Sequence, residues 1–125
     1  RNMNKIYFIR FIFFFTMLFT SVMSFISIDP SIAKILIQDK LLHVIAFFVI
    51  SFLAYASDFK IKRIILFVVL ILYGLLIEVI QNSLEYRTFE LYDLLSDTIG
   101  IIFGYIAWKY LKNFYPGYWF ILISP

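Results

Sequence analysis

The strongest constraint on this chain is a series of long apolar runs separated by short polar stretches. The first run extends from Ile6 to Ile26 and is interrupted only by Arg10 and a few hydroxyl residues. A helix needs about 20 mostly apolar residues to cross the hydrocarbon core of a bilayer, and this run is long enough. A cleaved signal peptide is the alternative, because basic residues precede the apolar core, but no small-residue cleavage site follows. We therefore expect an integral membrane protein.

Composition and the later apolar runs support the same class. Of the 125 residues, 63% are hydrophobic and 15% are charged, whereas soluble domains are about 45–50% apolar. The last stretch, 118–125, is too short to cross a bilayer and is expected to lie at its surface as an interfacial C-terminal tail. The sequence thus predicts an all-α fold, one domain over residues 1–125, with four transmembrane helices at about 6–26, 41–56, 64–80 and 93–111.

The basic residues predict how this bundle is oriented. With four spans, both termini and the loop at 57–63 lie on one side, which then carries eight of the eleven Lys and Arg residues. Short cytoplasmic loops are enriched in Lys and Arg, so we expect a multi-pass protein with both termini in the cytoplasm. The basic residues form no continuous tract, and nucleic acid is therefore not an expected partner. The chain has no cysteine, which excludes disulfides and thiolate chemistry.

With this topology, ionisable residues gather at the extracytoplasmic edge of three spans. They recur at spacings of three or four, so that each pair lies on one face of its helix. Ionisable groups at this depth are costly unless they are paired, so we expect the basic members to neutralise some of the acids. The expected polar cluster, which either binds a ligand or is structural, consists of Asp39, Lys40, His43, Glu78, Gln81, Arg87, Asp93 and Asp97.

Glycines extend the same pattern along the last span. Gly100 and Gly104 continue the face of Asp93 and Asp97 in a G-x-x-x-G pattern, which permits close approach of a neighbouring helix. We expect this span to pack inside the bundle, with its acids directed inward. The helix-packing glycines predicted from the sequence are Gly74, Gly100 and Gly104.

The order of these residues resembles the VanZ-like family. Asp39-Lys40-x-x-His43 opens one span, Gly74-x-x-x-Glu78-x-x-Gln81 ends another, and Arg87, Asp93 and Gly100 follow. The resemblance covers about residues 29–104. It implies a small protein of the bacterial inner membrane, related to a member associated with tolerance to the glycopeptide teicoplanin. The family usually has Asn where this chain has Asp97, which adds a charge to the cluster.

The residues of the cluster are compatible with two kinds of chemistry, metal binding and acid–base catalysis. A metal site would need His43, the only histidine, together with carboxylates such as those of Asp39, Glu78 and Asp93, a set that suits a first-row metal better than calcium. We favour instead a histidine that hydrogen-bonds a neighbouring acid, and expect neither a metal nor a cofactor. Paired acids also suit acid–base catalysis, but the sequence has no nucleophile or cofactor motif, so we favour a non-enzymatic role.

Two functions stay open. In the first, the cluster binds an envelope lipid or a lipid-linked glycan, with the planar guanidinium of Arg87 suited to a phosphate. In the second, the chain is an accessory structural subunit of a larger membrane complex, because it is small and has no sizeable soluble domain. The expected partners are accordingly membrane lipids and, in the second case, other integral membrane proteins.

Overall fold

The computed structural model describes residues 3–25, 39–83 and 91–114 of the chain. In these ranges the chain forms four α-helices and no strand. The helices are α1 (Met3–Phe25), α3 (Asp39–Ala56), α4 (Arg63–Asn82) and α5 (Leu91–Phe114). The all-α prediction is therefore confirmed, and each predicted span corresponds to one of these helices. The predicted C-terminal tail lies outside the described residues.

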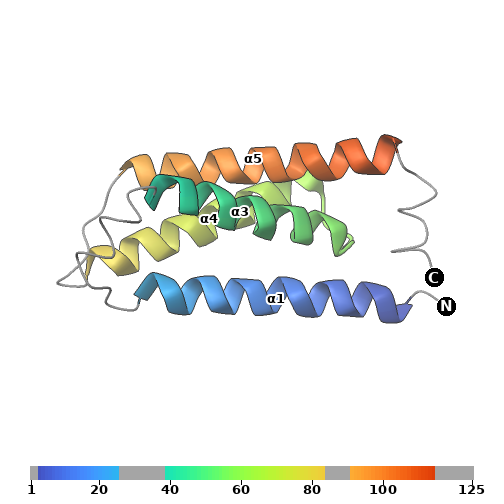
Figure 1. The fold of residues 1–125 in the computed structure, drawn as a ribbon, viewed down its shortest axis with the longest axis horizontal. Helices are drawn as coiled ribbons and strands as arrows, with labels where there is room; N and C mark the ends of the chain where they lie inside the picture. The colour runs from blue at the N-terminus through green and yellow to red at the C-terminus, as the bar shows by residue number, and fades with distance from the viewer. Residues whose placement is uncertain (1–2, 26–38, 84–90, 115–125) are drawn as a thin grey trace.

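The four helices lie side by side, each antiparallel to the one before it in the chain (Figure 1). The start of α1, the α3–α4 connection and the end of α5 therefore share one end of the bundle. We call this the basic end, because its described residues include Lys5, Arg10, Lys60, Lys62, Arg63, Lys109 and Lys112. The opposite end, where α3 and α5 begin and α4 finishes, is called the cluster end, because it carries His43, Glu78, Asp93 and Asp97.

Two of the helices are long and apolar enough to cross a membrane, as judged by length and composition. They are Lys5–Phe25 within α1 and Arg63–Asn82, which is α4. In α3 the apolar part, Leu41–Ala56, is shorter. A membrane protein is therefore supported, whereas four spans stay a prediction.

The closest packing in the bundle is between α3 and α5. A Cβ atom on Gly104 would lie 2.6 Å from the backbone oxygen of Phe48 and 2.7 Å from the Cβ of Ser51, so only glycine fits there. Gly100 is equally close to the backbone of α3, at Val44. Between the helices, the buried Ser51 hydroxyl donates a 2.8 Å hydrogen bond to the carbonyl of Ile101. Small residues on α5 thus allow the backbones of α3 and α5 to approach closely.

Helix α1 packs against α3 and α4 and also makes polar contacts with α4 and the α3–α4 connection. The Tyr73 hydroxyl of α4 donates to the backbone oxygen of Met17 at 2.9 Å. At the basic end, the Arg10 guanidinium donates to the backbone oxygens of Ser57 at 2.9 Å and Asp58 at 2.8 Å. Among the residues of α1 whose side chains are described, Phe13 is the buried one. Most of α1 therefore presents apolar side chains outward.

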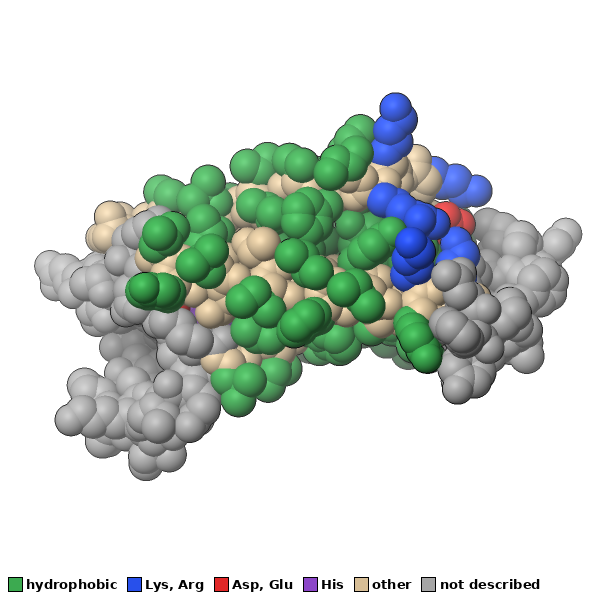
Figure 2. Space-filling model, turned by 90° about the horizontal axis from the view of Figure 1, so that it is seen from above, with side chains coloured by type: hydrophobic (Ala, Val, Ile, Leu, Met, Phe, Trp, Pro, Cys, Tyr) green, Lys and Arg blue, Asp and Glu red, His purple; other side chains and the backbone are tan. Residues whose placement is uncertain are grey.

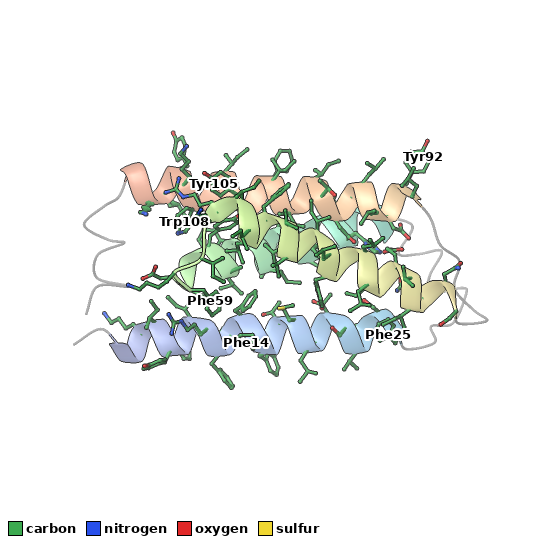
Figure 3. All side chains as sticks on the ribbon, turned by 180° about the vertical axis from the view of Figure 1, so that it is seen from behind. Phe14, Phe25, Phe59, Tyr92, Tyr105 and Trp108 are labelled. Atoms are coloured by element: carbon green, nitrogen blue, oxygen red, sulfur yellow. The ribbon has the colours of Figure 1, made fainter. Side chains whose placement is uncertain are left out.

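On the face seen in Figure 2, apolar side chains cover much of the described surface, and Lys and Arg side chains gather at one end. Exposed large apolar residues occur on every described helix, for example Phe11, Phe48, Leu72 and Phe103. Aromatic side chains mark both ends of the bundle, with Tyr105 and Trp108 at the basic end and Tyr92 at the cluster end (Figure 3). Water would solvate such a surface poorly, and lipid is the solvent it suits.

Candidate functional site

The shortest polar contact at the cluster end joins α3 to α5. His43, in the second turn of α3, places its Nδ1 atom 2.6 Å from Oδ1 of Asp97 on α5. The Asp97 side chain is 1% exposed and that of His43 is 14% exposed. Because an ionised carboxylate can only accept a hydrogen bond, an ionised Asp97 would accept from Nδ1–H of His43, and a neutral imidazole would then keep its lone pair on Nε2.

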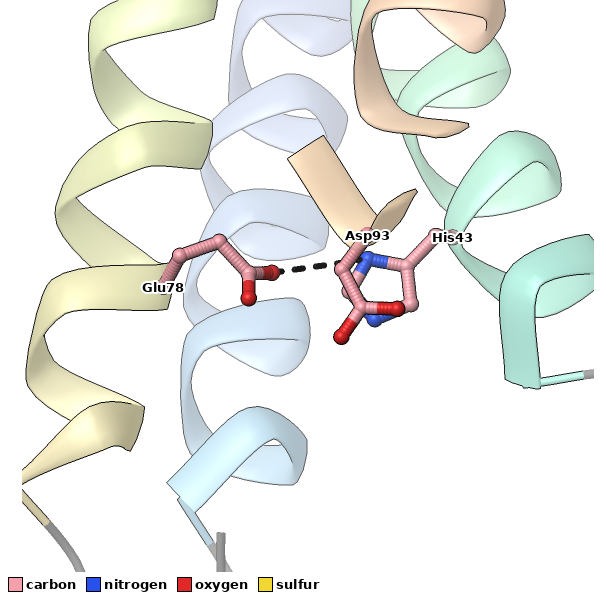
Figure 4. A group of neighbouring side chains, drawn as sticks. All are labelled: His43, Glu78 and Asp93. Atoms are coloured by element: carbon pink, nitrogen blue, oxygen red, sulfur yellow. Dashed lines mark ion pairs between the residues drawn. The ribbon is translucent and has the colours of Figure 1, made fainter. Parts of the chain in front are cut away.

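Two further carboxylates lie beside this pair. Oε2 of Glu78, a fully buried residue on α4, is 3.8 Å from Nδ1 of His43. Asp93, in the first turn of α5, is also buried. One ring nitrogen of His43 and one carboxylate oxygen each of Glu78 and Asp93 lie within 4.8 Å of one another (Figure 4). Three helices thus bring one imidazole and three carboxylates to a single place.

A glycine on α4 makes room for this arrangement. Gly74 precedes Glu78 by four residues and therefore lies on the same face of α4. A Cβ atom at this position would lie 3.0 Å from Oδ2 of Asp97, a tighter contact than most side chains show. The absence of a side chain at Gly74 lets the Asp97 carboxylate lie against α4 while its other oxygen binds His43.

The structure brings together four of the residues predicted from the sequence and gives a fifth, Gln81, a hydrogen-bond partner on α1. His43, Glu78, Asp93 and Asp97 are in proximity. Gln81 is buried, but its amide donates a 2.7 Å hydrogen bond to the backbone oxygen of Ser24, so it connects α4 to α1.

The other predicted members are not described at the side-chain level. Asp39 and Lys40 form the start of α3, but their side chains are not described, and Arg87 lies outside the described residues. Sequence reasoning did not identify Asp97 as the partner of His43, because helical spacing relates residues within one helix and not across two. The four-residue spacing from Asp93 placed Asp97 in the predicted cluster, and its replacement of the family's usual Asn marked the position, but neither signal identified its partner.

The arrangement limits the chemistry of the site. Buried carboxylates are costly unless hydrogen-bond donors or cations compensate them. The imidazole of His43 is one such donor, to Asp97, and carboxylate oxygens can bind ligands that donate hydrogen bonds or carry positive charge. Sugar hydroxyls and metal cations both meet this requirement.

Comparison with known proteins identifies the family of the chain. The family model described as VanZ/LLP1 matches residues 2–113, a range that includes all four described helices except the last residue of α5. Neither a curated protein nor a solved structure matches significantly. The resemblance drawn from the motif residues is confirmed by this match, and the chain belongs to the VanZ/LLP1 family.

Proposed function

We propose that this protein crosses the bacterial inner membrane four times and uses its cluster end to bind the polar head of an envelope lipid or a lipid-linked glycan. One observation carries the proposal. His43, Glu78, Asp93 and Asp97 come from three helices and meet at the end of the bundle opposite the basic end. A buried polar group at the edge of an otherwise apolar bundle is a candidate functional site by default.

The antiparallel packing supports four spans. Helices α3 and α5 lie alongside α4, which is long and apolar enough to cross by itself. Both also expose large apolar side chains, including Ile45 and Phe48 on α3 and Phe103 and Ile106 on α5. A helix that packs beside a spanning helix and presents such a surface is expected to lie within the hydrocarbon region as well.

The charge distribution supports an outward-facing cluster. The basic end carries most of the Lys and Arg residues, and such ends face the cytoplasm. The cluster end would then lie at the outer leaflet, where the headgroups of envelope lipids and lipid-linked glycans are found. Carboxylates and an imidazole at that depth are suited to hydroxyl groups of a sugar, and Arg87, predicted from the sequence as a cluster member, would suit a phosphate.

A tolerance assay tests the proposal. The chain is expressed in a teicoplanin-susceptible bacterium, and the minimal inhibitory concentration of teicoplanin is compared with that of the empty vector. We expect the wild type to raise this concentration, and Glu78→Gln and Asp93→Asn to abolish the increase while the protein still accumulates in the membrane. The matched control is Asp58→Asn, which neutralises an exposed acid near the basic end.

The results distinguish a role for the cluster from lipid association with the apolar surface. Full tolerance in the Glu78→Gln and Asp93→Asn variants would contradict a role for the cluster. Direct support would come from mass spectrometry of lipids that copurify with the wild type and are lost from both variants. Unchanged lipids in the variants would show that they associate with the apolar surface and not with the cluster.

The exposed surface of α1 favours a second candidate, an accessory subunit of a larger membrane complex. Large apolar residues, including Phe8, Phe11, Phe15 and Phe19, are exposed along α1, which offers a surface for a partner helix as well as for lipid. Blue-native electrophoresis after extraction in mild detergent distinguishes the two. A species much larger than a detergent-bound monomer would support the subunit role, whereas a monomer would remove its support.

A further inference from the structure

The donor atoms at the cluster end are arranged closely enough to hold one metal ion. We propose that His43, Glu78 and Asp93 bind a divalent first-row transition metal. Their three ligand atoms lie within 4.8 Å of one another. Metal–ligand distances of about 2.0–2.2 Å place two ligand atoms on one ion roughly 3–4.4 Å apart. Small side-chain rotations would therefore bring all three atoms to bonding distance.

Asp97 has a different role in this site. Its Oδ1 atom is 2.6 Å from Nδ1 of His43, which is closer than two ligands on one ion normally approach. Histidine ligands of metals characteristically donate their other ring N–H to a carboxylate, which fixes the tautomer and the ring orientation. With Nδ1 held by Asp97, Nε2 is the ring nitrogen of His43 that is left to bind the metal. Asp97 is thus a positioning residue for the ligand.

The burial of the ligands is compatible with a bound cation. Glu78 is fully buried, and Asp93 and Asp97 are at most 6% exposed. Buried charges are either paired or coordinate metals, and a divalent ion would balance the charges of Glu78 and Asp93 at once. The competing source of positive charge is the chain itself, through Lys40 or Arg87, and the experiment below discriminates between them.

The ligand types predict which metal is preferred. Imidazole and carboxylate together suit Zn²⁺ or Mn²⁺, whereas Mg²⁺ and Ca²⁺ prefer all-oxygen sites. Three protein ligands would leave at least one position for water or for an oxygen of a bound headgroup. This inference concerns the same site as the proposed function. It rests on the position of that site and not on which lipid binds there.

Metal titration of the full chain tests the proposal. The protein is purified in mild detergent, stripped with a chelator and titrated with Zn²⁺ and, separately, Mn²⁺ and Mg²⁺ by calorimetry. Bound metal is counted by elemental analysis. We expect one saturable Zn²⁺ per chain, weaker binding of Mg²⁺, loss of the site in His43→Gln and Asp93→Asn, and about 10–100-fold weaker binding in Asp97→Asn.

Control measurements separate metal binding from effects of the substitutions on folding and from lipid binding. Asp58→Asn should bind Zn²⁺ as the wild type does. Because a ligand that binds only the folded state stabilises it, Zn²⁺ should also raise the thermal unfolding temperature of the wild type, which needs no variant. No envelope lipid is added to the titration and the tolerance assay does not measure bound Zn²⁺, so this proposal and the tolerance proposal can fail separately.

Three results would overturn the metal site. One is the absence of saturable Zn²⁺ binding and of thermal stabilisation in the wild type. Another is equal binding by wild type and folded His43→Gln. The third is Zn²⁺ binding that emerges only after Arg87→Gln or Lys40→Gln, because a basic side chain would then be the native countercharge.

Discussion

His43 and Asp97 form the contact on which the geometry of the cluster depends, because their hydrogen bond spans α3 and α5 at 2.6 Å. Together they fix the imidazole between two helices and place its ring beside Glu78. The sequence identified both residues as cluster candidates but could not pair them, since pairing depends on how the helices pack.

Substitutions of Asp97 separate its charge from its hydrogen bond. Asp97→Asn keeps an acceptor oxygen and should reduce the free energy of unfolding by about 0.5–1.5 kcal/mol. Asp97→Leu leaves His43 without this acceptor and should cost more, about 1–3 kcal/mol. Denaturant unfolding in detergent measures both. Equal destabilisation by Asn and Leu would contradict a hydrogen bond between the two side chains.

Gly74→Ala tests the space left for the Asp97 carboxylate. The new Cβ atom would lie 3.0 Å from Oδ2 of Asp97, and overpacking of this kind costs roughly 1–3 kcal/mol. In an Asp97→Ala background the carboxylate is absent, so the same substitution should cost much less. A double-mutant cycle on unfolding free energies measures this coupling. Additive effects would show that Gly74 is important for some other reason.

At the scale of the elements, α5 is held against α3 by contacts that only glycine permits. The G-x-x-x-G spacing of Gly100 and Gly104 predicted close packing of α5, and the structure places both glycines against the backbone of α3. The pattern did not reveal the partner helix, because the same spacing suits any neighbour. It also gave no sign that Gln81 connects α4 to α1.

Gly104→Val should separate α5 from α3. Backbone oxygen and Cβ atoms of α3 lie within 2.7 Å of the position of the first added carbon, and backbone cannot move aside cheaply. We expect a loss of at least about 1–3 kcal/mol of unfolding free energy. The control is Phe103→Ala, at an adjacent residue that is 53% exposed and faces outward. A larger effect in the control than in Gly104→Val would contradict this packing.

Tyr73→Phe should loosen α1 selectively. The Tyr73 hydroxyl contacts the Met17 backbone oxygen at 2.9 Å and the Ser21 hydroxyl at 2.7 Å. Removing it should cost about 0.5–1.5 kcal/mol and accelerate hydrogen exchange in α1 and not in α3 or α5. Exchange measured by mass spectrometry in detergent checks this. Uniform acceleration in all helices would argue against a local attachment of α1.

Across the whole molecule, the long apolar runs were sufficient to predict the four helices, because the length and continuity of an apolar run can be read from the sequence without knowledge of tertiary contacts. The surroundings of Trp108, in contrast, could not be predicted from the sequence. It lies near the end of the predicted span at 93–111 and, in the structure, at the basic end, but it is only 6% exposed, stacked on Tyr55 with Lys112 over its ring. The sequence predicts that an aromatic residue lies near the end of a helix. Whether its side chain faces the surroundings or the interior of the bundle depends on packing.

In the proposed orientation, the cluster end faces the outside of the cell and the basic end faces the cytoplasm. Because the chain contains no cysteine, single substitutions can report each end without background. Ser83→Cys lies just after α4 at the cluster end, and Ile61→Cys lies in the α3–α4 connection at the basic end, both exposed and uncharged.

Labelling of these two variants with a membrane-impermeant maleimide in intact cells is the most direct test. We predict that Ser83→Cys reacts in intact cells, whereas Ile61→Cys reacts only after the membrane is permeabilised. The opposite pattern, or equal labelling of both variants in intact cells, would contradict an outward-facing cluster.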